Sequence, residues 1–313
     1  MGIGIGLGLA DMPFSDGRAF WRWVDLCEAG GVDSLWQTDR LVSRDPILEC
    51  MSMMAALAGG TRRLKFGMNV ASVGLRDPLL LAKQCATIDF LSNGRLLPAF
   101  GIGNEKAPDW AAMGRPTQGR GQRTDEGLEL IRRLWTEDSV SFEGKYYQYK
   151  DACISPKPLQ KDFPLWIGGS SEAAIRRTAR FGTGWLAGLE SAEQVGPVVE
   201  AIKRACREAG REIDPEHFGA GFQVRFGRPD EPFLVKRFEA YRRRTGRDPG
   251  NQYVIGTAEQ MLERLAIYVR GGVFKFILRP VGIDDEDMLR QTRRLIEDVL
   301  PHGPGLIKLA AAA

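Results

Sequence analysis

Strand-like and helix-like segments alternate along almost the whole chain. Short apolar runs are separated by stretches in which apolar residues recur with helical periodicity. Eight strands are expected at residues 3–9, 34–37, 64–73, 95–100, 165–167, 184–187, 218–225 and 273–278. Eight principal helices are expected at residues 15–29, 46–57, 78–91, 120–135, 171–180, 192–208, 258–269 and 285–299. Repeated strand–helix units imply parallel strands with right-handed crossovers, and eight such units close into a (β/α)8 TIM barrel.

Three segments interrupt this alternation. Residues 104–118 form a long polar loop, residues 138–151 read as an inserted β-hairpin with a turn at Glu143-Gly144, and residues 229–251 are polar and basic without a strand signal. We therefore expect residues 1–303 to form a single barrel domain with these three insertions. The low-complexity tail at residues 304–313 is left out of the fold prediction.

An open doubly wound sheet is the alternative architecture, because GIGIGLG near the start of the chain resembles a dinucleotide-binding fingerprint. That fingerprint must follow a strand and open a helix. Here the glycines lie inside the first expected strand, so the barrel is favoured.

Composition excludes several classes of function. The net charge is +3, with both signs interspersed, so neither nucleic acid nor a membrane surface is an expected partner. Five widely spaced cysteines without a CxxC pair favour reduced thiols and a cytoplasmic location. The chain has only two histidines, which excludes a multi-histidine metal site, and no spacing of acidic residues singles out another metal cage.

Polar residues and glycines follow the expected strands, which is where a barrel places its active site. The candidates are Asp39, Arg40, Asn69 to Arg76, Gly101 to Glu105, Gly168 to Ser171, Trp185, Arg225 and Arg279. Arg225 and Arg279 are expected to point into the barrel opening at which the strands end. There they would bind an anion, either on the substrate or on a cofactor. The competing interpretation pairs them with acidic residues of neighbouring loops.

The stretch Gly168-Gly169-Ser170-Ser171 links an apolar run to a helical pattern. Glycines let a ligand approach the main chain, and the amides and dipole at a helix start favour a phosphate. A plain strand-to-helix turn with a serine cap has the same residue types.

Several longer segments resemble the bacterial-luciferase-like superfamily of flavin- or deazaflavin-dependent oxidoreductases. The most specific are LSNGRLLPAFGIG, IGGSSEAA and GTGW, which stand in order with EAGGVDSLWQTDR, SPKPLQ and GTAEQMLERLAIYVRGGVFKFILRP. The resemblance covers nearly the entire chain and implies a (β/α)8 barrel. The motifs are much more specific for the superfamily than for any one reaction.

The resemblance also implies roles for individual residues. Asn69-Val70 would form the bulge behind the flavin ring, often a non-prolyl cis peptide in relatives. Asn104 and Glu105 would reach the ring or the substrate, with Glu105 as an acid or base. The phosphate end would lie at Gly168, Gly169, Ser170 and Ser171, with Trp185 as the following wall and Asp39 counted among the cofactor-binding residues.

One position departs from the family pattern. Many relatives have a histidine after the aspartate of the second strand, where this chain has Asp39-Arg40. Arginine does not exchange a proton near neutral pH. Arg40 is therefore a candidate catalytic residue that would bind an anionic substrate or stabilise a peroxyflavin, rather than one that transfers a proton.

These observations predict an enzyme whose cofactor supplies the reaction. The leading hypothesis is a monooxygenase that uses oxygen and reduced FMN, delivered by a separate flavin reductase, on a small organic substrate. The alternatives are a hydride-transfer oxidoreductase dependent on the deazaflavin coenzyme F420 and a non-catalytic flavin-binding accessory protein. The resemblance further implies a homodimer.

Overall fold

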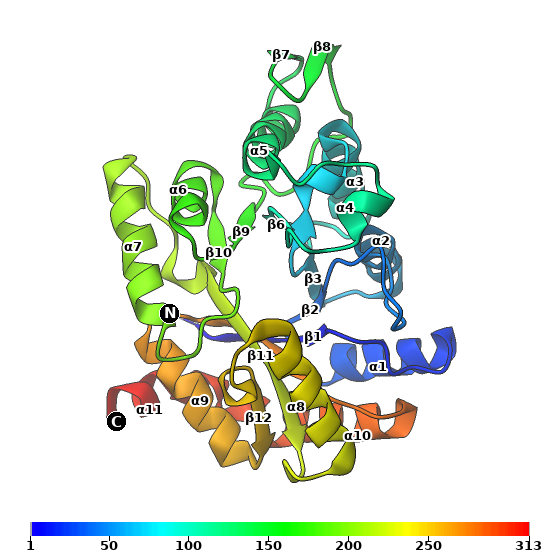
Figure 1. Cartoon of the computed structure of the whole chain (residues 1–313), viewed down its shortest axis with the longest axis vertical. Coiled ribbons are helices and arrows are strands. Elements are labelled where there is room, and N and C mark those ends of the chain that lie inside the picture. Colours follow the sequence, from blue (N-terminus) through cyan, green and yellow to red (C-terminus); the bar gives the residue numbers. More distant parts are fainter. Residues whose placement is uncertain (1, 313) are drawn as a thin grey trace.

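The computed structural model describes residues 2–312 of the chain, which fold around a curled, mostly parallel sheet (Figure 1). The barrel strands are β1 (Gly4–Leu9), β2 (Ser34–Gln37), β3 (Lys65–Met68), β4 (Ala71–Ser72), β5 (Leu96–Leu97), β6 (Ala99–Gly101), β9 (Trp166–Gly168), β10 (Gly184–Leu186), β11 (Phe218–Phe226) and β13 (Lys275–Pro280). The third and fourth barrel strands are each broken in two, as β3 with β4 and β5 with β6.

Strand pairing closes the sheet into a ring. β1 lies between β13 and β2, β3 pairs with β5, and β6 pairs with both β4 and β9. β10 and β11 complete the circuit back to β13. All of these pairs are parallel, which confirms the α/β barrel predicted from the alternation.

Helices cover the outside of the barrel (Figure 1). They are α1 (Gly17–Ala29), α2 (Cys50–Gly60), α3 (Pro78–Leu91), α5 (Arg120–Thr136), α6 (Glu172–Phe181), α7 (Val195–Glu208), α9 (Ala258–Arg270) and α10 (Asp285–Asp298). Side-chain caps fix several of their starts; Asp16, for example, accepts a hydrogen bond from Ala19 N at 2.8 Å. Helix α2 begins four residues later than the predicted residue 46, because Glu49 is extended and caps the helix through Ser52 N.

The three insertions have structures of their own. The predicted hairpin is confirmed as antiparallel strands β7 (Val140–Glu143) and β8 (Gln148–Ala152), which project away from the barrel in Figure 1. The loop after β6 contains the short helix α4 (Asp109–Ala112). The basic insertion contains helix α8 (Pro232–Thr245), and it is followed by β12 (Tyr253–Gly256), an unpredicted strand that pairs with the end of β11.

The remaining elements are short. Four 3₁₀ turns, η1 (Val73–Leu75), η2 (Pro215–His217), η3 (Pro249–Asn251) and η4 (Leu300–Gly305), occur within residues 2–312. The tail that was left out of the prediction forms helix α11 (Leu306–Ala312), with Leu306 buried against the core; Ala313 lies outside the described residues. No helix within the described chain has both the length and the apolar character to span a bilayer.

The glycines of the first strand have a packing role. A Cβ at Gly6 would lie 2.4 Å from Ser34 Oγ, and one at Gly8 would lie 2.8 Å from Ile277 Cγ2. Large side chains fill the barrel here, and Trp36, Trp166 and Ile277 belong to one buried cluster. The GIGIGLG pattern therefore serves close packing inside the barrel, in agreement with the interpretation against a dinucleotide fingerprint.

Candidate functional site

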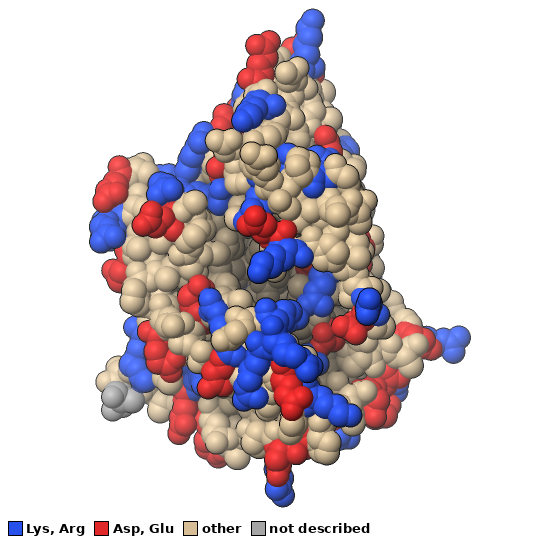
Figure 2. Space-filling model, viewed as in Figure 1, with Lys and Arg blue, Asp and Glu red and all other residues tan. Residues whose placement is uncertain are grey.

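A cavity of about 300 Å³ opens where the barrel strands end. Its lining comes from seven barrel strands or their ends, helix α8 and the segment before β12. We call it the main cavity; its lining residues are Ala10, Thr38, Arg40, Asn69, Val70, Gly168, Gly169, Leu186, Ala187, Gly188, Leu189, Gln223, Tyr241, Arg244, Gln252 and Arg279. Figure 2 shows a hollow in this face of the molecule with basic side chains at its rim.

One wall of the main cavity is built from small and apolar groups. The peptide bond between Asn69 and Val70 is cis, as the family resemblance implied. Val70 occupies a notch between two glycines: a Cβ at Gly101 would lie 2.8 Å from Val70 Cγ2, and one at Gly168 would lie 2.9 Å from the same atom. Glycine at both positions therefore leaves room for the Val70 side chain beside the cavity.

The glycine–serine stretch at the end of β9 borders the same wall. Gly169 has a φ of +103°, a conformation that favours glycine, and its N–H donates to Leu186 O at 3.2 Å. Ser171 caps helix α6 by accepting from Ala174 N at 3.3 Å. The Ser170 hydroxyl is buried and has no hydrogen-bond partner within the described chain. An unsatisfied hydroxyl beside main chain at a helix start suits a phosphate oxygen.

Trp185 lies behind this wall rather than on the cavity surface. Its side chain is fully buried, and its indole N–H donates to Gly169 O at 2.7 Å. The expectation that Trp185 itself forms a wall is not met in the structure. The residue instead holds the loop that contributes Gly168 and Gly169 to the lining.

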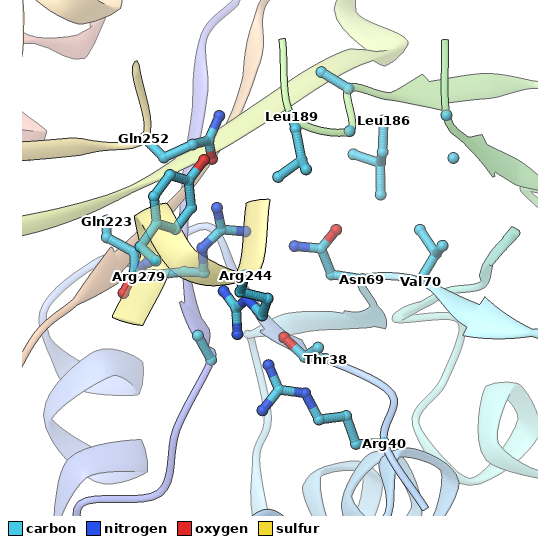
Figure 3. A pocket seen from close by; sticks show the side chains of 16 residues that line it. Thr38, Arg40, Asn69, Val70, Leu186, Leu189, Gln223, Arg244, Gln252 and Arg279 are labelled. Carbon is cyan, nitrogen blue, oxygen red and sulfur yellow. The ribbon is translucent and has the colours of Figure 1, made fainter. Parts of the chain in front are cut away.

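Asp39 and Arg40 are neighbours in the chain with different surroundings. Both carboxylate oxygens of Asp39 bind Arg76, at 2.7 and 2.8 Å, and one also accepts from Ser72 N at 2.9 Å. Asp39 thus ties the end of β2 to β4 and to the turn that follows. Arg40 points into the main cavity (Figure 3) and has no hydrogen bond or ion pair with any described residue.

A second cavity of about 470 Å³ adjoins the first, since Arg40 and Arg244 line both. We call it the side cavity. Asn104 lines it, and the main-chain carbonyl of Asn104 accepts from Trp110 Nε1 at 2.9 Å. Glu105 lines neither cavity: its side chain is 64% exposed and forms an ion pair with Arg120 at 3.1 Å. The predicted catalytic role of Glu105 therefore stays a prediction without support from its position.

The two arginines predicted to share the mouth are separated by their partners. Arg225 is buried and bonds to Asp287 at 2.6 Å and to Glu231 at 3.0 Å, so it does not line the cavity. This corrects the expected anion-binding role of Arg225 in favour of the ion-pair interpretation. Arg279 does line the main cavity, and its only hydrogen bond within the described chain is to Gly221 O at 3.0 Å. Burial lowers the pKa of Arg279 below its ordinary value.

Helix α8 contributes two lining residues that the sequence analysis did not identify, Tyr241 and Arg244. The signal was present in YRRRT, because residues three apart share one face of a helix. In the sequence analysis, residues 229–251 are described only as polar and basic without a strand signal, and so this helix is not identified there. Gln223 and Gln252, from β11 and the segment before β12, were also missed.

The chain matches the family model described as luciferase-like monooxygenase over residues 9–249. An F420-dependent glucose-6-phosphate dehydrogenase of Amycolatopsis mediterranei is 28% identical over 91% of this chain and 94% of its own. An FMNH2-dependent dimethylsulfone monooxygenase of Pseudomonas putida is 31% identical over 53% of this chain and 46% of its own. An uncharacterized protein of Mycobacterium tuberculosis is 35% identical over 53% of this chain, and the match spans 57% of that relative's length.

Solved structures show the same fold at low identity. The monooxygenase RslO1 from Streptomyces bottropensis has a TM-score of 0.79 and 21% identity, covering 96% of this chain and 99% of that one. An F420-dependent secondary alcohol dehydrogenase has a TM-score of 0.79 and 19% identity, covering 98% of this chain and 99% of that one. Relatives thus include users of FMN and users of F420. With the family model matched across most of the barrel, the chain belongs to the luciferase-like monooxygenase family.

Proposed function

We propose that the protein is a monooxygenase that uses reduced FMN and oxygen to oxidise a small organic substrate in the main cavity. The observation that carries the proposal is the composition of one cavity wall. Val70, Gly168 and Gly169 offer a small, apolar surface suited to a flat ring. Ser170, whose buried hydroxyl has no hydrogen-bond partner within the described chain, follows Gly169 directly. Ring-shaped cofactors are commonly held by such apolar walls with a few placed polar groups.

The residues of the glycine–serine stretch would hold the phosphate end. Gly168 and Gly169 leave the main chain accessible, and the hydroxyl of Ser170 would donate a hydrogen bond to a phosphate oxygen. The start of α6 favours negative charge. Trp185 keeps the loop in place through Gly169 O. When bound, the reduced flavin would supply the electrons for oxygen activation, while the chain supplies binding, orientation and exclusion of water.

A flavin reductase would be the partner that supplies reduced FMN. Gly4, Gly6 and Gly8 of GIGIGLG lie within β1 and are closely packed, so they are not free to bind a dinucleotide. A reductant generated on another protein is consistent with this arrangement.

F420-dependent hydride transfer is the second candidate. It is favoured by one observation: two of the relatives that align with about nine tenths of this chain are F420-dependent glucose-6-phosphate dehydrogenases, at 28% and 27% identity over 91% and 88% of it. Arg40 would bind substrate under either proposal, because it lines the main cavity and has no hydrogen bond or ion pair with any described residue.

Cofactor titration separates the two candidates. FMN, reduced FMN under anaerobic conditions and F420 are each added to the purified protein, and the tryptophan fluorescence is followed. We expect reduced FMN to bind most tightly; tight binding of F420 alone would overturn the leading proposal. Oxygen uptake no faster than that of free reduced FMN, across the substrates tested, would favour an accessory flavin-binding protein instead.

Two variants test the roles assigned to single residues. Ser170→Ala is expected to weaken FMN binding about tenfold and to leave riboflavin binding unchanged, because riboflavin lacks the phosphate. Glu105→Gln is expected to change turnover less than about threefold, since a surface ion pair contributes little. A loss of turnover above that level in Glu105→Gln would restore the catalytic role predicted from the family resemblance.

A further inference from the structure

Three arginines and no acidic residue line the main cavity within the described chain. They come from distant parts of the sequence: Arg40 follows β2, Arg244 lies in the last turn of α8, and Arg279 is on β13. Figure 3 shows their guanidinium groups directed toward the same part of the cavity. Like charges gathered in one cavity repel one another and require an anion to balance them.

The nearby acidic side chains are occupied elsewhere. Both oxygens of Asp39 bind Arg76, and Asp11 forms an ion pair with Arg237. Arg40 and Arg244 have no polar partner among residues 2–312, and Arg279 has only the Gly221 carbonyl. None of the three cavity arginines therefore forms an ion pair with a carboxylate of the described chain.

Three buried or nearly buried arginines elsewhere in the chain are paired with carboxylates. Arg76 binds Asp39, Arg177 binds Asp125 at 2.6 Å, and Arg225 binds Asp287. Buried charges are normally paired in this way. Among the described residues, the half-buried Arg40 and Arg279 lack the carboxylate that these three arginines have, which favours a ligand that completes them.

Neutral polar groups accompany the arginines. The Tyr241 side chain is only 4% exposed, and its hydroxyl has no hydrogen-bond partner within the described chain. Tyr241 lines the same cavity as Arg244, one turn earlier on α8. A buried hydroxyl without a partner is rare and marks a place where a ligand can accept or donate a hydrogen bond.

From this geometry we infer that Arg40, Arg244 and Arg279 bind a doubly negative tetrahedral oxyanion on the substrate, of the phosphate monoester class. A ligand with two negative charges balances three guanidinium groups better than a ligand with one. Guanidinium groups also bind such oxyanions through paired hydrogen bonds. The inference rests on the proposed function, in which the opposite wall at Val70 holds the cofactor ring. The cofactor's own phosphate is assigned to Ser170, so the arginines remain for the substrate.

The charge requirement is tested with two small probes of nearly equal shape. Methyl phosphate and methyl sulfate are titrated calorimetrically into the cofactor-free protein at about pH 8, where the phosphate monoester is dianionic because its second pKa is about 6. We expect methyl phosphate to bind at least about tenfold more tightly than methyl sulfate. Equal binding of the two probes, or binding of neither, would overturn the inference.

Variants locate the binding site. Arg40→Gln, Arg244→Gln and Arg279→Gln are each expected to weaken methyl phosphate binding about tenfold or more. Arg243→Gln is the matched control, because Arg243 is an exposed neighbour on α8 that lines neither cavity. Arg244 is itself on an exposed helix end, so its variant is expected to fold normally, as circular dichroism would verify. An equal loss in Arg243→Gln would indicate general electrostatic attraction and contradict the inference.

A cofactor titration distinguishes the source of the anion. If the arginines serve the substrate, the three glutamine variants keep the wild-type preference for FMN over riboflavin, whereas Ser170→Ala loses it. Loss of that preference in the arginine variants would assign them to the cofactor phosphate and overturn the substrate assignment. The calorimetric titration contains no cofactor, so its result does not depend on whether FMN or F420 proves to be the natural one.

Discussion

Arg225 and Arg279 lie on paired strands of the barrel, yet their surroundings are opposite. Two carboxylates, on Asp287 and Glu231, bind the buried Arg225, whereas Arg279 faces the main cavity with one carbonyl as its partner. Burial alone would lower the pKa of both guanidinium groups. The two carboxylates outweigh burial and raise the pKa of Arg225, while burial prevails and lowers the pKa of Arg279. Its ion pairs give Arg225 a role in stability, whereas Arg279, which has no ion pair within the described chain, is available to a ligand.

The largest expected effect breaks this comparison directly. Arg225→Met leaves the buried Asp287 with the more exposed Arg290 as its ionic partner, and we expect the free energy of unfolding to fall by about 3 kcal/mol. Arg279→Met removes a single hydrogen bond and is expected to cost about 1 kcal/mol or less. Urea unfolding of both variants measures the difference. Equal losses would show that the two arginines have the same role.

Asp39 and Arg40 repeat the contrast within one dipeptide. Asp39→Asn weakens the bidentate pair with Arg76, which keeps its contact with Glu49, and we expect a loss of about 3 kcal/mol in the free energy of unfolding. Arg40→Gln is expected to change stability by less than about 0.5 kcal/mol, because Arg40 has no partner to lose. Thermal unfolding of the two variants side by side would contradict the contrast if Arg40→Gln proved the more damaging.

The uncharged wall of the cavity provides the next test. A Cβ in Gly168→Ala would lie 2.9 Å from Val70 Cγ2, so the valine side chain must move. We expect a cost of about 1 to 3 kcal/mol in FMN binding. The double variant with Val70→Ala removes the contacting methyl groups and is expected to recover part of that loss. No recovery in the double variant would place the effect elsewhere than at the Val70 contact.

The smallest expected effect depends on pH. Burial alone would raise the pKa of Glu231, but the attraction of Arg225 and the hydrogen bonds to the carboxylate outweigh it and hold the pKa below its ordinary value. A lowered folded-state pKa stabilises the protein above the unfolded-state pKa of about 4.3. This stability is lost as the pH falls through the lower, folded-state value.

Glu231→Gln should therefore reduce stability at neutral pH by less than about 1 kcal/mol, because Glu231 is partly exposed. The difference from the wild type should vanish in acid, as followed by urea unfolding between about pH 3 and 7. Glu239→Gln, at an exposed position on α8, is the control for a general change of charge. A difference that persists at the acid end would contradict the assignment to Glu231.

Local patterns were sufficient for the framework of the molecule. The alternation of strands and helices predicted the barrel, and the turn at Glu143-Gly144 predicted the β7–β8 hairpin. The position of Gly168 and Gly169 at the end of a strand predicted their place at the cavity. In each case the signal lies within a few residues, because strand ends and helix starts are set by neighbouring groups.

Contacts between distant segments decided what the pattern left open. Asp287, which binds Arg225, is 62 residues further along the chain. Arg244 reaches the cavity because α8 packs against β12 through Tyr241 and Tyr253. Trp185 had the position of a wall residue in the sequence and proved to be buried behind it. Strand position thus brings a residue to the mouth, but the partners that surround it determine where its side chain points.

By itself, then, the sequence determined a (β/α)8 barrel of the luciferase-like family and the end of the barrel at which the main cavity opens. Only the tertiary structure decided which charges are free there: Arg225 is neutralised, Glu105 faces solvent with Arg120, and Arg40, Arg244 and Arg279 share one cavity. The physical reason is that periodicity and turn chemistry are local, whereas the neutralisation of a charge depends on every segment that folds against it.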